Sequence, residues 1–121
     1  EGIAVKNPSK SAIDVIKQHV SRIETATEAQ IEEAVFDLIS AEKLVVEGCS
    51  AAALAIVKEN LDTYRGKKVG IVISGGNIDS RMLSTLILRG LVRDGRITQL
   101  RFEIDDTPGQ LADIARIIGE N

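Results

Sequence analysis

Residues 69–77 read VGIVISGGN. The first five positions form a nearly continuous run of β-branched residues, which is typical of a strand buried on both faces. Ser74 stands where such a strand would end, and the glycine pair that follows predicts a turn. Apolar residues then recur at helical spacing from Met82 to Val92. A strand, a glycine-rich turn and a helix in this order predict an α/β fold, helix-rich with one buried strand.

Three further helices are expected upstream of this unit. The first opens at Ser11 and carries an apolar face as far as Val20. The second begins at a capping box of Thr27 and Gln30 and ends near Lys43, and it has the clearest amphipathic pattern in the chain. The third runs from Ala51 to about Asn60 and is rich in alanine. Between the first two helices, residues 22–25 are a short strand candidate.

The C-terminal stretch predicts one more strand and one more helix. Apolar and polar residues alternate from Ile97 to Ile104, as in a half-buried strand. Thr107 is placed to cap the next helix, with Pro108 at its first position and Gln110 completing a capping box. The turn at residues 93–96 is a possible domain boundary.

Composition excludes several classes of partner. Fifteen basic and eighteen acidic residues give a net charge of −3, so no basic surface for nucleic acid or an anionic membrane is expected. No apolar run approaches the ~20 residues of a membrane span, and no signal peptide is visible. With one histidine and one cysteine, no metal cluster and no catalytic triad is predicted. The single cysteine suits a reducing compartment, and we expect a cytoplasmic protein.

Three segments have residue types that suit ligand binding. The strongest is Ser74-Gly75-Gly76-Asn77, because ligands of open α/β sheets bind beyond the carboxyl ends of the strands and glycines let the backbone come close to them. This segment is neither a P-loop nor a dinucleotide fingerprint, and a plain turn is the alternative.

The second segment begins at Glu47, beside a helix start built of small residues. Glu47 could face a ligand, or it could simply favour the helix dipole. Cys49 is interpreted as a packing residue, since no histidine lies near it in the sequence to activate it. The third segment, residues 105–111, is either a well-capped helix or a small-ligand site made from backbone N–H groups.

The order of these motifs resembles the C-terminal part of pyridoxal-phosphate-dependent threonine ammonia-lyases (threonine dehydratases) of the tryptophan-synthase-β-like fold, fold type II. The matching segments are Gly2 to Lys6, Leu44 to Gly48, Gly66 to Val69, and Ser74 to Asp79. The resemblance covers about residues 1–94. Residues 97–121 look like the first strand and helix of an ACT domain, because residues 106–111 match its Asp-x-Pro-Gly-x-Leu signature.

The resemblance implies pyridoxal phosphate as cofactor and a role for five residues in binding it. The serine of this motif, here Ser74, hydrogen-bonds the pyridine nitrogen in the family. Gly75, Gly76 and Asn77 accompany it, and Glu47 matches a glutamate near the cofactor ring. Family members commonly read Glu-Gly-Ala-Gly-Ala from this glutamate onward, whereas this chain has Cys49 and Ser50 at the third and fourth positions.

The ACT-like end implies an amino-acid effector site. Its expected residues are Asp106, Pro108, Gly109 and Leu111. ACT domains commonly pair side by side, so a homo-oligomer is expected. The parent enzyme would deaminate L-threonine to 2-oxobutanoate and ammonia, as in isoleucine biosynthesis or in threonine breakdown.

No segment of the chain matches the lysine that forms the Schiff base with the cofactor. The chain also starts at Glu1 rather than at methionine, so we expect it to be part of a longer lyase and inactive by itself. The alternative is a non-enzymatic regulatory module that binds an amino acid through its ACT-like end.

Overall fold

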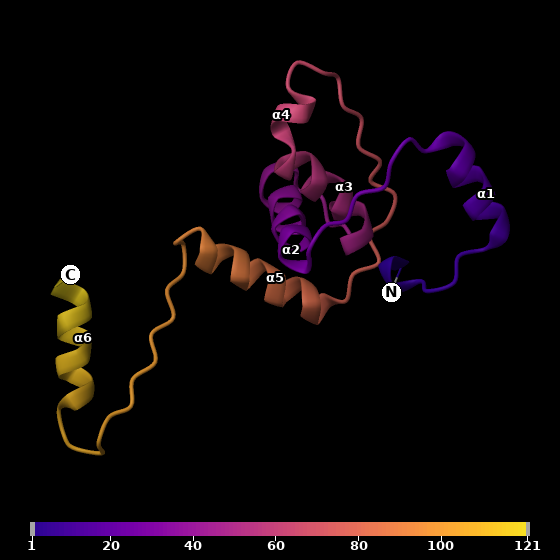
Figure 1. Cartoon of the computed structure of the whole chain (residues 1–121). Helices are drawn as coiled ribbons and strands as arrows, with labels where there is room; N and C mark the ends of the chain where they lie inside the picture. Colours follow the sequence, from indigo (N-terminus) through magenta and orange to yellow (C-terminus); the bar gives the residue numbers. More distant parts are fainter. Residues whose placement is uncertain (1, 121) are drawn as a thin grey trace.

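The computed structural model describes residues 2–120, and their regular structure is helical (Figure 1). The elements in chain order are η1 (Gly2–Ala4), α1 (Lys10–His19), α2 (Glu28–Asp37), η2 (Leu38–Glu42), α3 (Gly48–Glu59), α4 (Leu61–Tyr64), α5 (Ser80–Arg93) and α6 (Gln110–Glu120). All five longer helices were expected from the sequence, with boundaries that differ by a few residues. None of the helices in the described range is long and apolar enough to cross a membrane.

The helix α2 begins and ends as its sequence predicts. The Thr27 hydroxyl accepts a hydrogen bond from the backbone N–H of Gln30 (3.3 Å), and the Gln30 side chain accepts one from the N–H of Thr27 (2.8 Å). The capping box is therefore confirmed. The helix continues into the wider π-helical turn η2, and Lys43 ends it in the left-handed conformation at φ 59°.

The core lies between α2, α3 and α5, which form the central group of helices in Figure 1. Small side chains of α3 let α2 approach closely, and one leucine of α5 closes the cluster. Its buried members are Ala34, Val35, Leu38, Val46, Ala51, Ala55 and Leu86. The alanine-rich helix α3 therefore packs closely against a second helix.

Gly90 makes the tightest contact between α2 and α5. A Cβ atom placed on Gly90 would lie 2.1 Å from Cδ2 and 2.3 Å from Cγ of Phe36, so only glycine fits against this ring. Phe36 is buried, and the guanidinium carbon of Arg93 lies 5.5 Å from the centre of its ring. Gly90 and Arg93, which are three residues apart on α5, thus both lie against a single aromatic side chain.

An ion network joins α3 to α2. The Lys58 ammonium contacts the carboxylates of Glu33 and Asp37, which are four residues apart on one face of α2. Burial lowers the pKa of Lys58, but hydrogen bonds to the two carboxylates outweigh it, so the net shift is upward. The hydrogen bond from Lys58 lowers the pKa of Glu33. Both shifts favour the charged pair at neutral pH.

None of the three predicted strands is seen in the structure of residues 2–120. No strand occurs among residues 2–120, and residues 22–25, 69–73 and 97–104 are extended without ladder partners. The run at 69–73 is not buried either, since Val72 is 78% exposed. A β-branched pattern gives a segment the preference for extended backbone, but a strand also needs a second segment to share its hydrogen bonds.

Two helix starts also differ from the predicted ones. Ser9, not Ser11, caps α1 by accepting from the N–H of Ala12 (3.2 Å). At the other end, α6 begins at Gln110 because Gly109 has φ +94°, so Thr107 and Pro108 lie before the helix. Both α1 and α6 stand apart from the central helices, and neither contains a buried residue (Figure 1).

Candidate functional site

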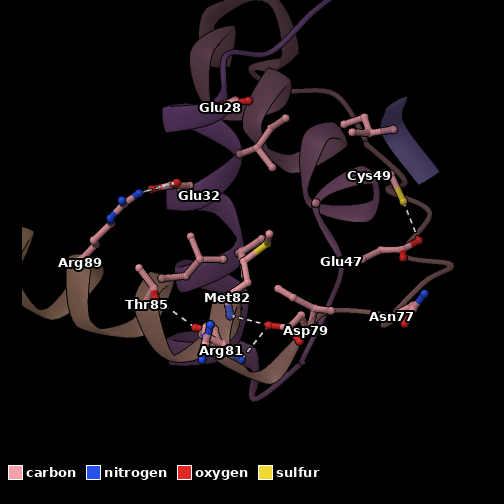
Figure 2. Close-up of a pocket in the computed structure, with 16 residues that line it drawn as sticks. Glu28, Glu32, Glu47, Cys49, Asn77, Asp79, Arg81, Met82, Thr85 and Arg89 are labelled. Atoms are coloured by element: carbon pink, nitrogen blue, oxygen red, sulfur yellow. Dashed lines mark hydrogen bonds and ion pairs between the residues drawn. The ribbon is translucent and has the colours of Figure 1, made fainter. Parts of the chain in front are cut away.

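A cleft of about 890 Å³ opens between α2, the start of α5 and the start of α3 (Figure 2). Its floor is apolar and comes from α2 and α5. Its rim has four carboxylates and two arginines. The rim residues are Glu28, Glu32, Glu47, Asp79, Arg81 and Arg89. No group of three or more histidine, cysteine or acidic side chains among the described residues is arranged to hold a metal ion.

Glu47 lies at the start of α3, where the sequence suggested a ligand-facing carboxylate. Its backbone carbonyl accepts from the N–H groups of Ser50 (3.1 Å) and Ala51 (3.2 Å), which makes it the capping residue of the helix. Its side chain makes no capping bond. The Oε1 atom instead accepts a hydrogen bond from the Cys49 thiol (2.6 Å), and both side chains line the cleft (Figure 2).

The same contact disfavours Cys49 as a nucleophile. The hydrogen bond to Glu47, followed by burial and the negative charge of that carboxylate, raises the pKa of the Cys49 thiol. A thiol with a raised pKa remains protonated at neutral pH, and the protonated form does not attack. The geometry therefore supports the interpretation of Cys49 as a packing residue.

The glycine pair of residues 75 and 76 lies against this same helix start. The carbonyl of Gly75 accepts from the N–H of Glu47 (3.1 Å) and from the Ser50 hydroxyl (3.1 Å). The N–H of Gly75 donates to Ser50 Oγ (2.9 Å). Two segments that the sequence analysis treated separately, residues 47–50 and 74–77, therefore form one site.

Both glycines lie close to their neighbours, so a larger residue at either position would need a neighbouring group to shift. A Cβ on Gly75 would lie 2.0 Å from Oε1 of Glu47, and one on Gly76 would lie 3.2 Å from the carbonyl oxygen of Val45. The missing side chains leave room for the carboxylate and for the neighbouring backbone.

The chain turns from Gly76 into α5 along the edge of the cleft. Asn77 lines the cleft, and Asp79 Oδ1 accepts from the N–H groups of Arg81 (3.0 Å) and Met82 (3.1 Å). Asp79 is therefore the cap of α5, so its carboxylate is engaged by the helix. This role could have been predicted, since aspartate is a favoured residue just before a helix.

Other lining residues were not identified from the sequence. Arg89 of α5 donates to Glu32 of α2 (2.8 Å), and Met82 and Thr85 lie between this pair and Glu47 (Figure 2). Glu28 and Glu32 have the i, i+4 spacing of one helix face, which was the only local signal for them. The pairing of Glu32 with Arg89 joins residues 57 positions apart and has no local signal.

The predicted site residues fall into two groups in space. Glu47 and Asn77 line the cleft, Gly75 and Gly76 lie directly behind Glu47, and Ser74 is exposed beside them. The expected effector residues are Asp106, Pro108, Gly109 and Leu111. They belong to the exposed segment before α6 and its first turn, away from the cleft (Figure 1).

The chain is similar to a known protein family. Residues 1–75 match the family described as pyridoxal-phosphate dependent enzyme. The chain belongs to this family. The match covers the N-terminal segment, α1 to α4 and the start of the Ser74 motif, and it ends at Gly75.

Two relatives extend the similarity to almost the whole chain. The chain is 39% identical over 120 residues to proteins named L-threonine ammonia-lyase from Thermotoga maritima and from Geobacter sulfurreducens. Each alignment covers 99% of this chain and 30% of the relative. A third relative, the beta-hydroxyaspartate dehydratase of Paracoccus denitrificans, is 39% identical over 64 residues, or 53% of this chain and 20% of its own length. No solved structure matches the chain significantly.

The residues around Ser74 fit part of a pyridoxal phosphate site. Ser74 has an exposed, neutral hydroxyl, which makes no hydrogen bond within residues 2–120. The backbone next to it is glycine and is held in place by Glu47 and Ser50. A flat aromatic ring can lie close to such a backbone, because no Cβ projects from it.

Proposed function

We propose that the chain is part of a lyase that deaminates L-threonine to 2-oxobutanoate and ammonia with pyridoxal phosphate. The observation that carries the proposal is the 39% identity, over 99% of this chain, to two proteins named L-threonine ammonia-lyase. The chain spans about 30% of the length of those relatives. Residues 1–94 would belong to the catalytic domain.

The five cofactor residues of this proposal have distinct roles. The Ser74 hydroxyl would hydrogen-bond the ring nitrogen, and Gly75, Gly76 and Asn77 would form the adjoining wall. Glu47 would lie near the ring, held by the Cys49 thiol and by its place at the start of α3. When bound, pyridoxal phosphate supplies an electron sink for loss of the α-proton and the β-hydroxyl. A neutral hydroxyl at the ring nitrogen stabilises charge less than a carboxylate does, which suits elimination.

Residues 97–121 would form the first strand and helix of an ACT-like regulatory domain. The support is the signature at residues 106–111 and the exposed state of this end of the chain, where Leu111 is 73% exposed. Asp106, Pro108 and Gly109 would contribute backbone groups for an amino-acid effector, with Leu111 beside them. The strand would form only when a second segment pairs with residues 97–104.

The direct test is to assay the full-length protein that contains this chain, with pyridoxal phosphate and L-threonine, for 2-oxobutanoate and ammonia. L-Serine and β-hydroxyaspartate serve as competing substrates, because a related protein is named for the latter. We expect turnover with L-threonine to exceed that with the other two. Amino-acid binding without any turnover would favour the non-enzymatic regulatory module instead.

The 121-residue chain by itself is expected to show no lyase activity. No lysine lines the cleft among the described residues, and no segment matches the cofactor-binding lysine of the family. There is then no group to hold the cofactor covalently or to remove the α-proton. The measurement is 2-oxobutanoate formation by the chain with L-threonine and pyridoxal phosphate, against free pyridoxal phosphate as control. A rate above that control would contradict the expectation.

Self-association of the chain through its C-terminal end is a further expectation. The segment at 97–104 leaves Leu100, Phe102 and Ile104 about half exposed, and α6 has no buried residue. Extended apolar segments with unpaired backbone groups favour pairing with a second copy. Sedimentation at micromolar concentration should therefore give a dimer or larger species.

Two variants separate this route from unspecific association. Phe102→Lys should shift the chain toward the 13.0 kDa monomer, while Lys17→Ala on the exposed face of α1 should not. A wild-type monomer with an ordered C-terminal segment would refute the expectation.

A further inference from the structure

We propose that Ser50 is the positioning residue of the cofactor segment: its hydroxyl fixes both peptide groups of Gly75 and thereby sets the orientation of Ser74. This inference rests on the proposed function, because it concerns how Ser74 is presented to the ring nitrogen. Ser50 itself lies behind the segment and is not among the residues that line the cleft.

The first observation is the burial of the hydroxyl. Ser50 is 3% exposed in the first turn of α3, and it is the one buried polar residue among those that the structure describes. A buried hydroxyl needs partners, since leaving it unpaired in such surroundings destabilises the fold. Both partners of the Ser50 hydroxyl are backbone groups of Gly75, 25 positions away in the sequence.

The second observation is which peptide groups those partners belong to. The N–H of Gly75 lies in the planar peptide group that also contains the Cα and carbonyl of Ser74. The carbonyl of Gly75 belongs to the next peptide group. Ser50 Oγ accepts from the first (2.9 Å) and donates to the second (3.1 Å), so one side chain holds two successive planes.

The third observation is that Gly75 needs such a restraint. A Cβ at this position would lie 2.0 Å from Oε1 of Glu47, so glycine lets the carboxylate lie against the backbone. Glycine has the greatest backbone freedom of all residues, so a segment containing it is defined only if other groups fix it. The Glu47 N–H also binds the Gly75 carbonyl, but within residues 2–120 the Gly75 N–H is bound only by Ser50. Removing the Ser50 hydroxyl would therefore free the plane next to Ser74.

Amide hydrogen exchange of the chain tests the restraint without cofactor or substrate. In Ser50→Ala, exchange at Gly75 should accelerate by about tenfold or more, because the N–H loses its acceptor. The amides of α2 should exchange as in the wild type. Ser50→Thr, which keeps a hydroxyl, should retain the protection of Gly75, and Ser84→Ala on the exposed face of α5 should change nothing.

A double-mutant cycle in the full-length protein tests the connection to Ser74. Ser50→Ala should lower kcat about tenfold with KM little changed, and it should have less than about a twofold effect when Ser74 is already alanine. Wild-type turnover with L-threonine, measured in parallel, reports on the proposed function separately.

Three results would overturn the inference. The first is that Ser50→Ala leaves the exchange rate at Gly75 unchanged. The second is that this variant unfolds, or loses protection across α2 as much as at Gly75. The third is that the effects of Ser50→Ala and Ser74→Ala on kcat are additive. The first two outcomes are independent of the cofactor. An inactive wild-type protein with the expected exchange pattern would instead count against the proposed function and leave the restraint on Gly75 established.

Discussion

Ser74→Ala in the full-length protein is expected to lower turnover by two orders of magnitude while leaving the fold intact. The hydroxyl is exposed and makes no bond within residues 2–120, so its loss leaves no unpaired partner in the chain. The proposed partner is the ring nitrogen, where charge develops during the reaction. Losing one such hydrogen bond costs about 2–4 kcal/mol, by comparison with single donors to developing charge in other enzymes. The measurement is kcat at saturating L-threonine.

The matched variant is Ser74→Thr, which retains the hydroxyl and should retain most of the turnover. Circular dichroism of the variants should superimpose on that of the wild type, since residue 74 is exposed. If kcat of Ser74→Ala stays within about threefold of the wild type, Ser74 is not the partner of the ring nitrogen.

Gly90→Ala should destabilise the chain more than any other single methyl addition at its glycines. The added Cβ would lie 2.1 to 2.5 Å from three carbons of the Phe36 ring, and that ring is only 3% exposed. Neither the ring nor the helix α5 can withdraw without opening the packing of α2 on α5. Overpacking of this kind costs about 3 kcal/mol, which urea unfolding followed by circular dichroism would measure.

Gly119→Ala is the control for helix propensity in the same experiment. A Cβ on Gly119 would have no neighbour within 4 Å, and alanine is the better helix former by roughly 1 kcal/mol. Its effect should be neutral or stabilising. A Gly90→Ala variant as stable as the wild type would show that α5 does not pack on Phe36 as described.

Local patterns in the sequence predicted the helices well. The capping box of Thr27 and Gln30 and the apolar spacing that follows are both properties of adjacent residues, so they could be read without the fold. Strand formation, in contrast, depends on residues that are distant from each other in the sequence. Residues 69–73 have the right composition, but pairing depends on a distant segment, which the composition of the run does not specify.

The sequence indicated individual residues of the site but not how they contact one another. Glu47 and the Ser74 motif were both singled out, and the structure brings them together through the Gly75 backbone. Nothing in their spacing indicates that contact. Ser50 was noted only as a difference from the usual family sequence, because its partners are 25 positions away. Gly90 looked like an ordinary helical position, since only the fold brings Phe36 against it.

The contact of residues 47 and 50 with Gly75 also closes a loop in the chain. The closed loop contains most of α3, the short helix α4 and the extended run before Ser74, and Gly66 turns at its exposed tip with φ +73° and open space around it. Each doubling of the length of a flexible loop adds only about 0.6 kcal/mol to the entropic cost of closing it. Changes in loop length near Gly66 should therefore cost little free energy and leave the geometry of the cleft unchanged. The length of the chain between Ser50 and Gly75 can vary, while the hydrogen bonds between these two residues determine the position of Ser74.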